Sequence, residues 1–217
     1  QHVGSVDLSK AATYSDASDK KIKNTGHGLQ VDAQIDGDTS SSDLGYLTVE
    51  GSQYNVLQFH IHCPSEHTMD GKVHDCEMHV VHQKEGATGL NDLLVGGIMY
   101  TASGSSDNTF LKKLGLPSGA PASKDAAQYS VVGTVNLQTE FGTLMSQGFY
   151  RYDGSLTTPP CTESVSWFVL ANGKTMSIGQ LEAFKAISGH SHPANNRPVQ
   201  LLNGRGIFKN TLPGCYD

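Results

Sequence analysis

The chain has 217 residues and a formal net charge of −6 with neutral histidines, because 21 Asp and Glu outnumber 15 Lys and Arg. This acidic balance argues against nucleic acid or an anionic membrane surface as a partner. The longest apolar runs, such as Leu93–Met99, are far shorter than the roughly 20 residues that span a bilayer, so we expect a soluble chain. A chain of this length can bury one substantial core, and we expect a single domain over residues 1–217.

Alternating or β-branched apolar segments separated by turn-forming residues predict a β-dominated fold. In chain order these segments are Gly28–Ile35, Leu44–Glu50, Tyr54–His62, Cys76–Gln83, Asp92–Tyr100 and Ser164–Leu170. The strongest turn signals between them are Asp36-Gly37-Asp38, Asp70-Gly71, Asp153-Gly154 and Asn172-Gly173. We therefore expect one large, twisted and mainly antiparallel β-sheet.

Helical signals are few and short. One covers Asn108–Leu114, and the other covers Ile178–Ile187 behind a possible N-cap at Ser177. Between them, the Gly-, Pro-, Ala- and Ser-rich stretch Gly115–Ser123 indicates a surface loop. Both helices are expected at the periphery of the sheet.

The densest chemical signal is a group of histidines on two of the predicted strands. His60 and His62 are two residues apart, and on a strand this spacing places both imidazoles on one face. A turn at Asp70-Gly71 would bring His79 beside them from the next strand. Three histidines that leave a fourth position open are the arrangement of a catalytic zinc site.

Two polar residues are placed to orient these ligands. Imidazoles that bind a metal usually donate their second N–H to a polar partner, which fixes the tautomer. Gln58 lies two residues before His60, and Glu77 lies two residues before His79, so each shares a strand face with its histidine. We assign Gln58 to His60 and Glu77 to His79.

The four cysteines form no Cys-x-x-Cys pair, which argues against a redox motif or a thiolate zinc site. Cys63 and Cys76 have the opposite parity to the histidines and should point to the other face of the sheet. If His60 pairs with His79, then Cys63 lies opposite Cys76 and a disulfide becomes possible. A tight hairpin centred on Asp70-Gly71 would instead shift the register by two and separate them.

Three motifs resemble the α-class carbonic anhydrases. They are the ligand strands Gln58–His62, Ser65–Thr68 and Glu77–His82, the signature segment Tyr152–Trp167 and the block Asn195–Gln200. The resemblance extends from about Asn24 to Gln200. It implies a Zn2+ enzyme of the large-sheet fold with short peripheral helices, in which a zinc-bound hydroxide converts carbon dioxide to bicarbonate and a proton.

The same resemblance implies roles for individual residues. Thr157 would accept a hydrogen bond from the hydroxide and pass its own proton to Glu66, and His27 would shuttle protons at the mouth of the cavity. Thr158 would lie beside bicarbonate, and sulfonamide or anion inhibitors would bind at the zinc. The apolar wall for carbon dioxide would consist of Val81, Val95, Leu156, Val165 and Trp167.

The opening of the chain departs from the family pattern. Gly4–Leu8 stands where the family usually has an aromatic-rich opening segment before a Gln-Ser-Pro-x-Asp-like strand, so we expect a short or divergent N-terminal segment. This leaves Cys215 as the candidate partner for Cys161, with a free thiol or a pairing between chains as the alternatives. Paired cysteines and the absence of an initiating Met favour a secreted, periplasmic or lumenal protein, although four thiols in a cytosolic enzyme would look similar.

Two other classes of protein compete with this interpretation. A cupin-like oxygenase or isomerase would use His60, His62 and Glu66 together as ligands of iron or manganese, but the expected glycines are replaced by Tyr54 and Val73. A binding, storage or mineral-matrix protein would keep the fold without the activity. The sequence contains no low-complexity acidic or Gly-Asn repeats of the kind that would favour a matrix role.

Overall fold

The structure is a computed structural model that describes residues 8–36, 39–187 and 194–210. Its helices are α1 (Leu8–Ala11), α2 (Thr109–Lys113), α3 (Leu137–Met145) and α4 (Ile178–Lys185). Its strands are β1 (Ala12–Tyr14), β2 (Lys21–Asn24), β3 (Leu29–Asp32), β4 (Ile35–Asp36), β5 (Ser41–Ser42), β6 (Gly45–Val49), β7 (Ser52–His62), β8 (Thr68–Met69), β9 (Lys72–Val73), β10 (Cys76–Lys84), β11 (Leu93–Ala102), β12 (Tyr129–Ser130), β13 (Phe149–Gly154), β14 (Val165–Leu170), β15 (Lys174–Met176) and β16 (Phe208–Asn210). Strands dominate, as the sequence predicts.

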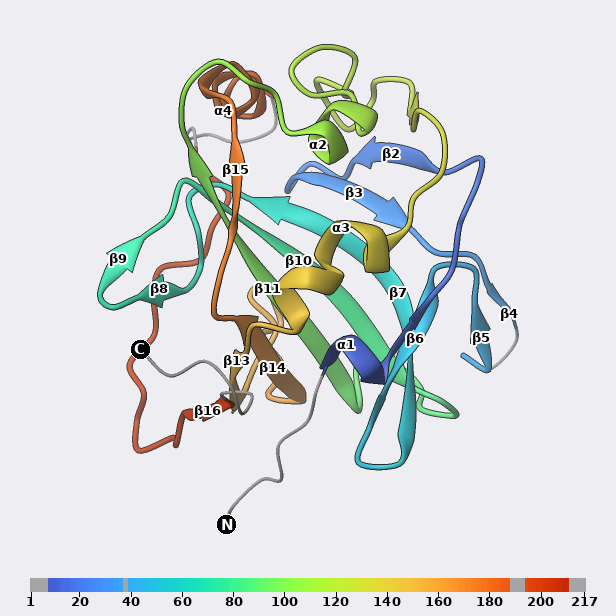
Figure 1. Ribbon diagram of the computed structural model, residues 1–217, viewed down its shortest axis with the longest axis vertical. Coiled ribbons are helices and arrows are strands. Elements are labelled where there is room, and N and C mark those ends of the chain that lie inside the picture. The colour runs from blue at the N-terminus through green and yellow to red at the C-terminus, as the bar shows by residue number, and fades with distance from the viewer. Residues whose placement is uncertain (1–7, 37–38, 188–193, 211–217) are drawn as a thin grey trace.

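A 12-stranded sheet organises the molecule (Figure 1). Its main path runs β12-β2-β3-β7-β10-β11-β14-β13-β16. Off this path, β6 pairs with β7, β1 pairs with β6, and β15 pairs with β11. All its pairings are antiparallel except those of β11 with β14 and with β15, which are parallel. The sheet is therefore mixed but mainly antiparallel, and its long central strands are β7, β10 and β11.

The two faces of the central strands have different neighbours. On one face, Phe59, Val80 and Ile98 belong to a large apolar core that also takes Phe110 of α2 and Phe141 of α3. Figure 1 shows α1 and α3 lying over this face, in front of β10 and β11. The other face carries the alternate residues of the same strands, and these include all three histidines of the predicted site.

The structure contains both predicted helices. Asn108 caps α2, and its side chain accepts the backbone N–H groups of Phe110 and Leu111. Ser177 caps α4, where it forms a reciprocal capping box with Gln180. Helices α1 and α3 were not predicted from the sequence.

The turn signals had mixed outcomes. The predicted turn at Asp153-Gly154 is wrong, because both residues extend β13 and pair with β14. In the Asp36-Gly37-Asp38 signal, residues 37 and 38 lie outside the described residues. Asn172-Gly173 does separate β14 from β15.

The turn at Asp70-Gly71 exists, but it does not set the register of the histidine strands. Asp70 and Gly71 have φ values of 50° and 75° and close the small hairpin of β8 and β9, which is a sheet of its own. Strand β7 instead pairs with β10 so that His60 lies opposite His79. Of the two registers open to the sequence, the structure has the one that places Cys63 opposite Cys76.

A disulfide joins Cys63 to Cys76, with their Cα atoms 4.1 Å apart. Both cysteines are buried in the apolar core, on the face away from the histidines. The bond closes the loop that carries Glu66 and the β8–β9 hairpin. It therefore limits how far the ends of the two histidine strands can separate.

We predict that replacing both Cys63 and Cys76 with Ala lowers the free energy of unfolding by about 3 kcal/mol, the value expected for a cross-link that closes a loop of this length. Chemical denaturation under non-reducing conditions measures this change. Cys161→Ala is the control, because Cys161 forms no disulfide within the described part of the chain. Equal unfolding midpoints for the double variant and the wild type would contradict the prediction.

Candidate metal centre

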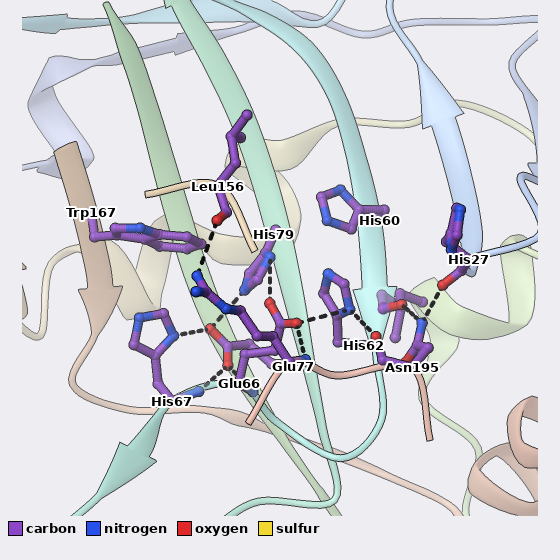
Figure 2. A network of polar contacts seen from close by, with 12 residues as sticks. His27, His60, His62, Glu66, His67, Glu77, His79, Leu156, Trp167 and Asn195 are labelled. Carbon is purple, nitrogen blue, oxygen red and sulfur yellow. Dashed lines mark hydrogen bonds and ion pairs between the residues drawn. The ribbon is translucent and has the colours of Figure 1, made fainter. Parts of the chain in front are cut away.

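Three imidazoles converge on one face of the sheet (Figure 2). His60 and His62 come from β7, and His79 comes from β10 directly opposite His60. The ring centroids are 4.8 Å apart for His60 and His62, 5.2 Å for His60 and His79, and 4.8 Å for His62 and His79. One nitrogen from each ring lies within 4.8 Å of the other two, which is a grouping that could hold a metal ion.

Each ring has a polar partner for one of its nitrogens. His60 Nδ1 lies 2.8 Å from Gln58 Oε1, and His79 Nε2 lies 2.9 Å from Glu77 Oε1. His62 Nδ1 lies 3.1 Å from the carbonyl oxygen of Asn195. These contacts leave Nε2 of His60, Nε2 of His62 and Nδ1 of His79 as the nitrogens that could bind an ion.

One observation that is independent of the family resemblance indicates that the three histidines suit a metal ion. His62 Nε2 is buried and has no hydrogen-bond partner among the described residues. An unpaired buried polar atom costs free energy, so such an atom in a native structure needs an explanation. Three neutral nitrogens with outer hydrogen bonds are the donor set that a catalytic zinc ion takes.

The electrostatics of the pocket favour the neutral form of two of the three imidazoles, His60 and His62. Burial holds the pKa of His60 well below its ordinary value, and the neighbouring His62 and His79 lower it further. Burial and the neighbouring His79 lower the pKa of His62 to about 4. Neutral rings are the state in which histidine nitrogens bind metal ions.

Glu77 is the centre of the polar network beneath the histidines. Its Oε1 accepts hydrogen bonds from His79 and, at 2.6 Å, from His67 Nδ1. Its Oε2 accepts the backbone N–H groups of Glu66 and His67, each at 2.9 Å. Burial opposes ionisation of this carboxyl, but His67 and His79 outweigh it and hold the pKa of Glu77 well below its ordinary value. Glu77 is therefore a buried carboxylate.

Two features on other strands of the sheet support this carboxylate. A Cβ on Gly97 would lie 2.8 Å from Glu77 Oε1, so the strand beside β10 has room for the carboxylate only because residue 97 is glycine. Tyr152 Oη lies 2.5 Å from His67 Nε2 and extends the chain of hydrogen bonds to β13. Burial and the charge of Glu77 raise the pKa of Tyr152, which keeps its hydroxyl protonated.

The structure does not join Thr157 to Glu66. Glu66 Oε1 accepts the backbone N–H of Arg197 at 2.6 Å, and Oε2 is buried without a hydrogen-bond partner in the described part of the chain. Thr157 lies half-buried in the loop between β13 and β14. The Arg197 guanidinium contacts this loop, with Nη1 3.2 Å from Ser155 Oγ.

An apolar cluster borders the histidines on the same face. Val81, Val95, Val165 and Trp167 are buried in it, and Leu156 packs against it. The ring centroids of Trp167 and His79 are 4.7 Å apart. Thr158, the remaining residue of the expected pocket, is exposed.

His27 lies apart from the other predicted residues, exposed in the turn between β2 and β3. Figure 2 shows it to one side of the triad, with its carbonyl directed at Asn195. Cys161 is half-buried in the loop before β14, while its candidate partner Cys215 lies outside the described residues.

The sequence pattern gives no signal for the partners that come from distant parts of the chain. The carbonyl of Asn195 that accepts from His62 is 133 residues away in sequence, and the contact of Arg197 with Glu66 spans 131 residues. The block Asn195–Gln200 stands out in the sequence only through its family resemblance. Strand periodicity relates residues on one strand or on paired strands, so it could not assign these two contacts.

These observations define a β-sheet protein in which three histidines that could hold a metal ion lie beside an apolar cluster. A model of the family described as eukaryotic-type carbonic anhydrase matches residues 3–211. The chain therefore belongs to this family, the α-class of carbonic anhydrases.

Several known proteins are similar to the chain. It is 34% identical over 188 residues to alpha carbonic anhydrase 4 of Arabidopsis thaliana, covering 86% of this chain and 63% of that protein. The α-carbonic anhydrase of Thermovibrio ammonificans in complex with sulfanilamide has 32% identity and a TM-score of 0.71, with coverage of 91% of this chain and 78% of that one. Dioscorin complexed with ascorbate has 28% identity and a TM-score of 0.76, with coverage of 92% and 77%. The chain spans about two thirds of the length of curated relatives that it matches.

We predict that Glu77→Gln weakens zinc binding by about 10- to 100-fold, the usual effect of removing an outer partner of a metal ligand. The amide keeps the shape of the side chain but loses the charge that orients His79. Competition with a chelator of known affinity measures the change, and Glu163→Gln, at an exposed position, is the matched control. Equal zinc affinities for the two variants would show that the Glu77 charge does not support the site.

Proposed function

We propose that the chain is one catalytic domain of a zinc-dependent carbonic anhydrase, which hydrates carbon dioxide reversibly to bicarbonate and a proton. The observation that carries the proposal is the convergence of three imidazoles whose other nitrogens already have polar partners. His60 and His62 would hold Zn2+ through Nε2, and His79 would hold it through Nδ1. When bound, zinc supplies Lewis acidity and lowers the pKa of a coordinated water to about 7.

In this proposal Glu66 and Thr157 orient the attacking water. Glu66 Oε2 is a buried acceptor without a partner among the described residues, and its other oxygen is fixed by the backbone N–H of Arg197. The Thr157 hydroxyl would donate a hydrogen bond to Glu66 Oε2. Its oxygen would then be left to accept a hydrogen bond from the attacking group, which turns a lone pair toward the carbon of carbon dioxide.

The apolar wall would receive carbon dioxide. Val81, Val95, Val165 and Trp167 form a buried surface next to His79, and Leu156 lies at its edge. An apolar, uncharged molecule displaces water from such a surface at little cost, whereas charged bicarbonate is better solvated outside it. Thr158, on the exposed side of the loop, would lie beside the departing bicarbonate.

His27 would carry the released proton to solvent. Its exposed position suits exchange of protons with buffer, and an imidazole is a common proton-transfer group in enzymes. Because the imidazole lies outside the group of ligands, it would act through intervening water. This assignment rests on the position of the turn and on the family resemblance.

The proposal extends to inhibitors and location. A relative from Thermovibrio ammonificans is described in complex with sulfanilamide, so we expect sulfonamides and small anions to bind at the zinc of this chain as well. The Cys63–Cys76 disulfide fits an oxidising compartment. We propose a secreted, periplasmic or lumenal protein. None of the described helices has the length and apolarity needed to cross a membrane.

Two alternative functions would require different roles for the same residues. A cupin-like metal site would need Glu66 as a ligand, but one of its oxygens is occupied by Arg197 and the grouping that could hold an ion does not include it. A binding protein without activity would share the fold, and one structural neighbour is described as dioscorin complexed with ascorbate. Measurement of activity separates that class from an enzyme.

We predict rapid hydration of carbon dioxide by the zinc-loaded protein in a stopped-flow assay with a pH indicator. Removal of zinc should reduce the rate to that of buffer alone, and returning zinc should restore it. His79→Ala should abolish the activity, whereas His74→Ala should retain it, because His74 contacts Thr101 away from the triad. A zinc-loaded wild type without activity would overturn the proposed enzyme and favour the binding protein.

A further inference from the structure

The side chain of Asn195 connects segments that are distant in sequence. Its amide nitrogen Nδ2 donates to the carbonyl oxygens of His27 at 2.7 Å and of Ile61 at 3.0 Å. Its Oδ1 accepts the backbone N–H of Cys63 at 2.8 Å. The amide therefore bridges the turn that carries His27 and the end of the strand that carries His62 (Figure 2).

The hydrogen bonds of the Asn195 side chain lie beyond the end of the β3–β7 ladder, where no backbone pairing among the described residues holds the turn to β7. The ladder between β3 and β7 ends at the pair Gln30 and His60, so His27 lies beyond its last register pair. Inside the turn, Thr25 N–H donates to Gly28 O and His27 N–H donates to Thr25 Oγ1, which ties the turn to itself. Asn195 supplies a contact from the turn to the far end of β7.

Gly28 is the residue that makes room for this bridge. A Cβ at position 28 would lie 2.7 Å from Asn195 Nδ2 and 3.0 Å from Ile61 O. Any side chain there would push the amide away from both of its carbonyl acceptors. Gly28, in the turn before β3, and the side-chain amide of Asn195, 167 positions later, fit closely together. This close fit indicates a specific contact between the two segments.

We propose that the Asn195 side chain is a positioning residue that holds the His27 turn against the ligand strand. The backbone of the same residue accepts from His62 Nδ1, so one residue fixes both a metal ligand and the proposed proton shuttle. The catalytic part of this inference rests on the proposed function. A tethered turn keeps the His27 imidazole within a narrow set of positions relative to the site, which is the condition for efficient transfer of a proton through water.

The variants that test it are Asn195→Ala and Asn195→Asp, with Asn196→Ala as the matched control. Asn196 is the adjacent half-buried asparagine and its side chain makes no hydrogen bond among the described residues. Asn195→Asp keeps an oxygen that accepts the Cys63 N–H and removes the two N–H groups that donate to His27 and Ile61. It is therefore the variant to measure if Asn195→Ala does not fold. His27→Ala gives the rate expected without the shuttle.

The first readout is the backbone ¹⁵N order parameter of His27 and Gly28 in the zinc-loaded protein. We expect the order parameters of these two amides to fall from about 0.85, the value of a rigid backbone, to below about 0.6 in the Asn195 variants. The Asn196 control should remain rigid. Rigid amides in the Asn195 variants would overturn the proposal, whether or not the protein hydrates carbon dioxide.

The second readout separates proton transfer from the addition of water to carbon dioxide. In dilute buffer, kcat of the Asn195 variants should fall roughly tenfold toward that of His27→Ala and recover with imidazole buffer, because a general acid–base step is impaired. The ratio kcat/KM should remain within about twofold. A parallel fall in kcat and kcat/KM without imidazole rescue would contradict the role in proton transfer. An inactive wild type would refute the proposed function, and the order parameters would still decide whether Asn195 holds the turn.

Discussion

The pairing of β7 with β10, with His60 opposite His79, is the constraint on which the rest of the site depends. Side chains alternate between the faces of a strand, so a slip of one residue would turn Phe59 and Ile61 toward the site and bury the imidazoles in the apolar core. Two features oppose such a slip. The disulfide fixes Cys63 opposite Cys76, and the small β8–β9 hairpin takes up the chain between the strands without imposing its own register on them.

The buried carboxylate of Glu77 links this strand register to the proposed metal site. Glu77 is fully buried, and a charge in such a position is tolerated only when it is paired and hydrogen-bonded. Its four hydrogen bonds orient His79 and also hold the backbone of Glu66 and His67. The same carboxylate therefore positions a proposed metal ligand and the loop that carries the proposed orienting acid. The apolar cluster around Trp167 excludes water from one side of this network and strengthens its electrostatic interactions.

The sequence was sufficient where periodicity or local chemistry determined the structure. The spacing of His60, His62 and Gln58 predicted a shared strand face, and Ser177 predicted the start of α4. It was insufficient where distant segments meet. The turn signal at Asp153-Gly154 was overridden by pairing with β14, and α3 gave no sufficiently clear pattern in advance. The contacts of Asn195 and Arg197 depend on how the C-terminal segment crosses the sheet, which no local spacing encodes.

A crystal structure of the zinc-loaded protein, with the ion located by anomalous scattering at the zinc edge, tests the central claim most directly. The account predicts one zinc ion bound by Nε2 of His60, Nε2 of His62 and Nδ1 of His79 at about 2.0–2.1 Å, with a non-protein oxygen as the fourth ligand. Gln58, Asn195 and Glu77 should keep their contacts with the outer nitrogens. Zinc bound by Glu66 as a fourth protein ligand, or bound away from these histidines, would contradict the account.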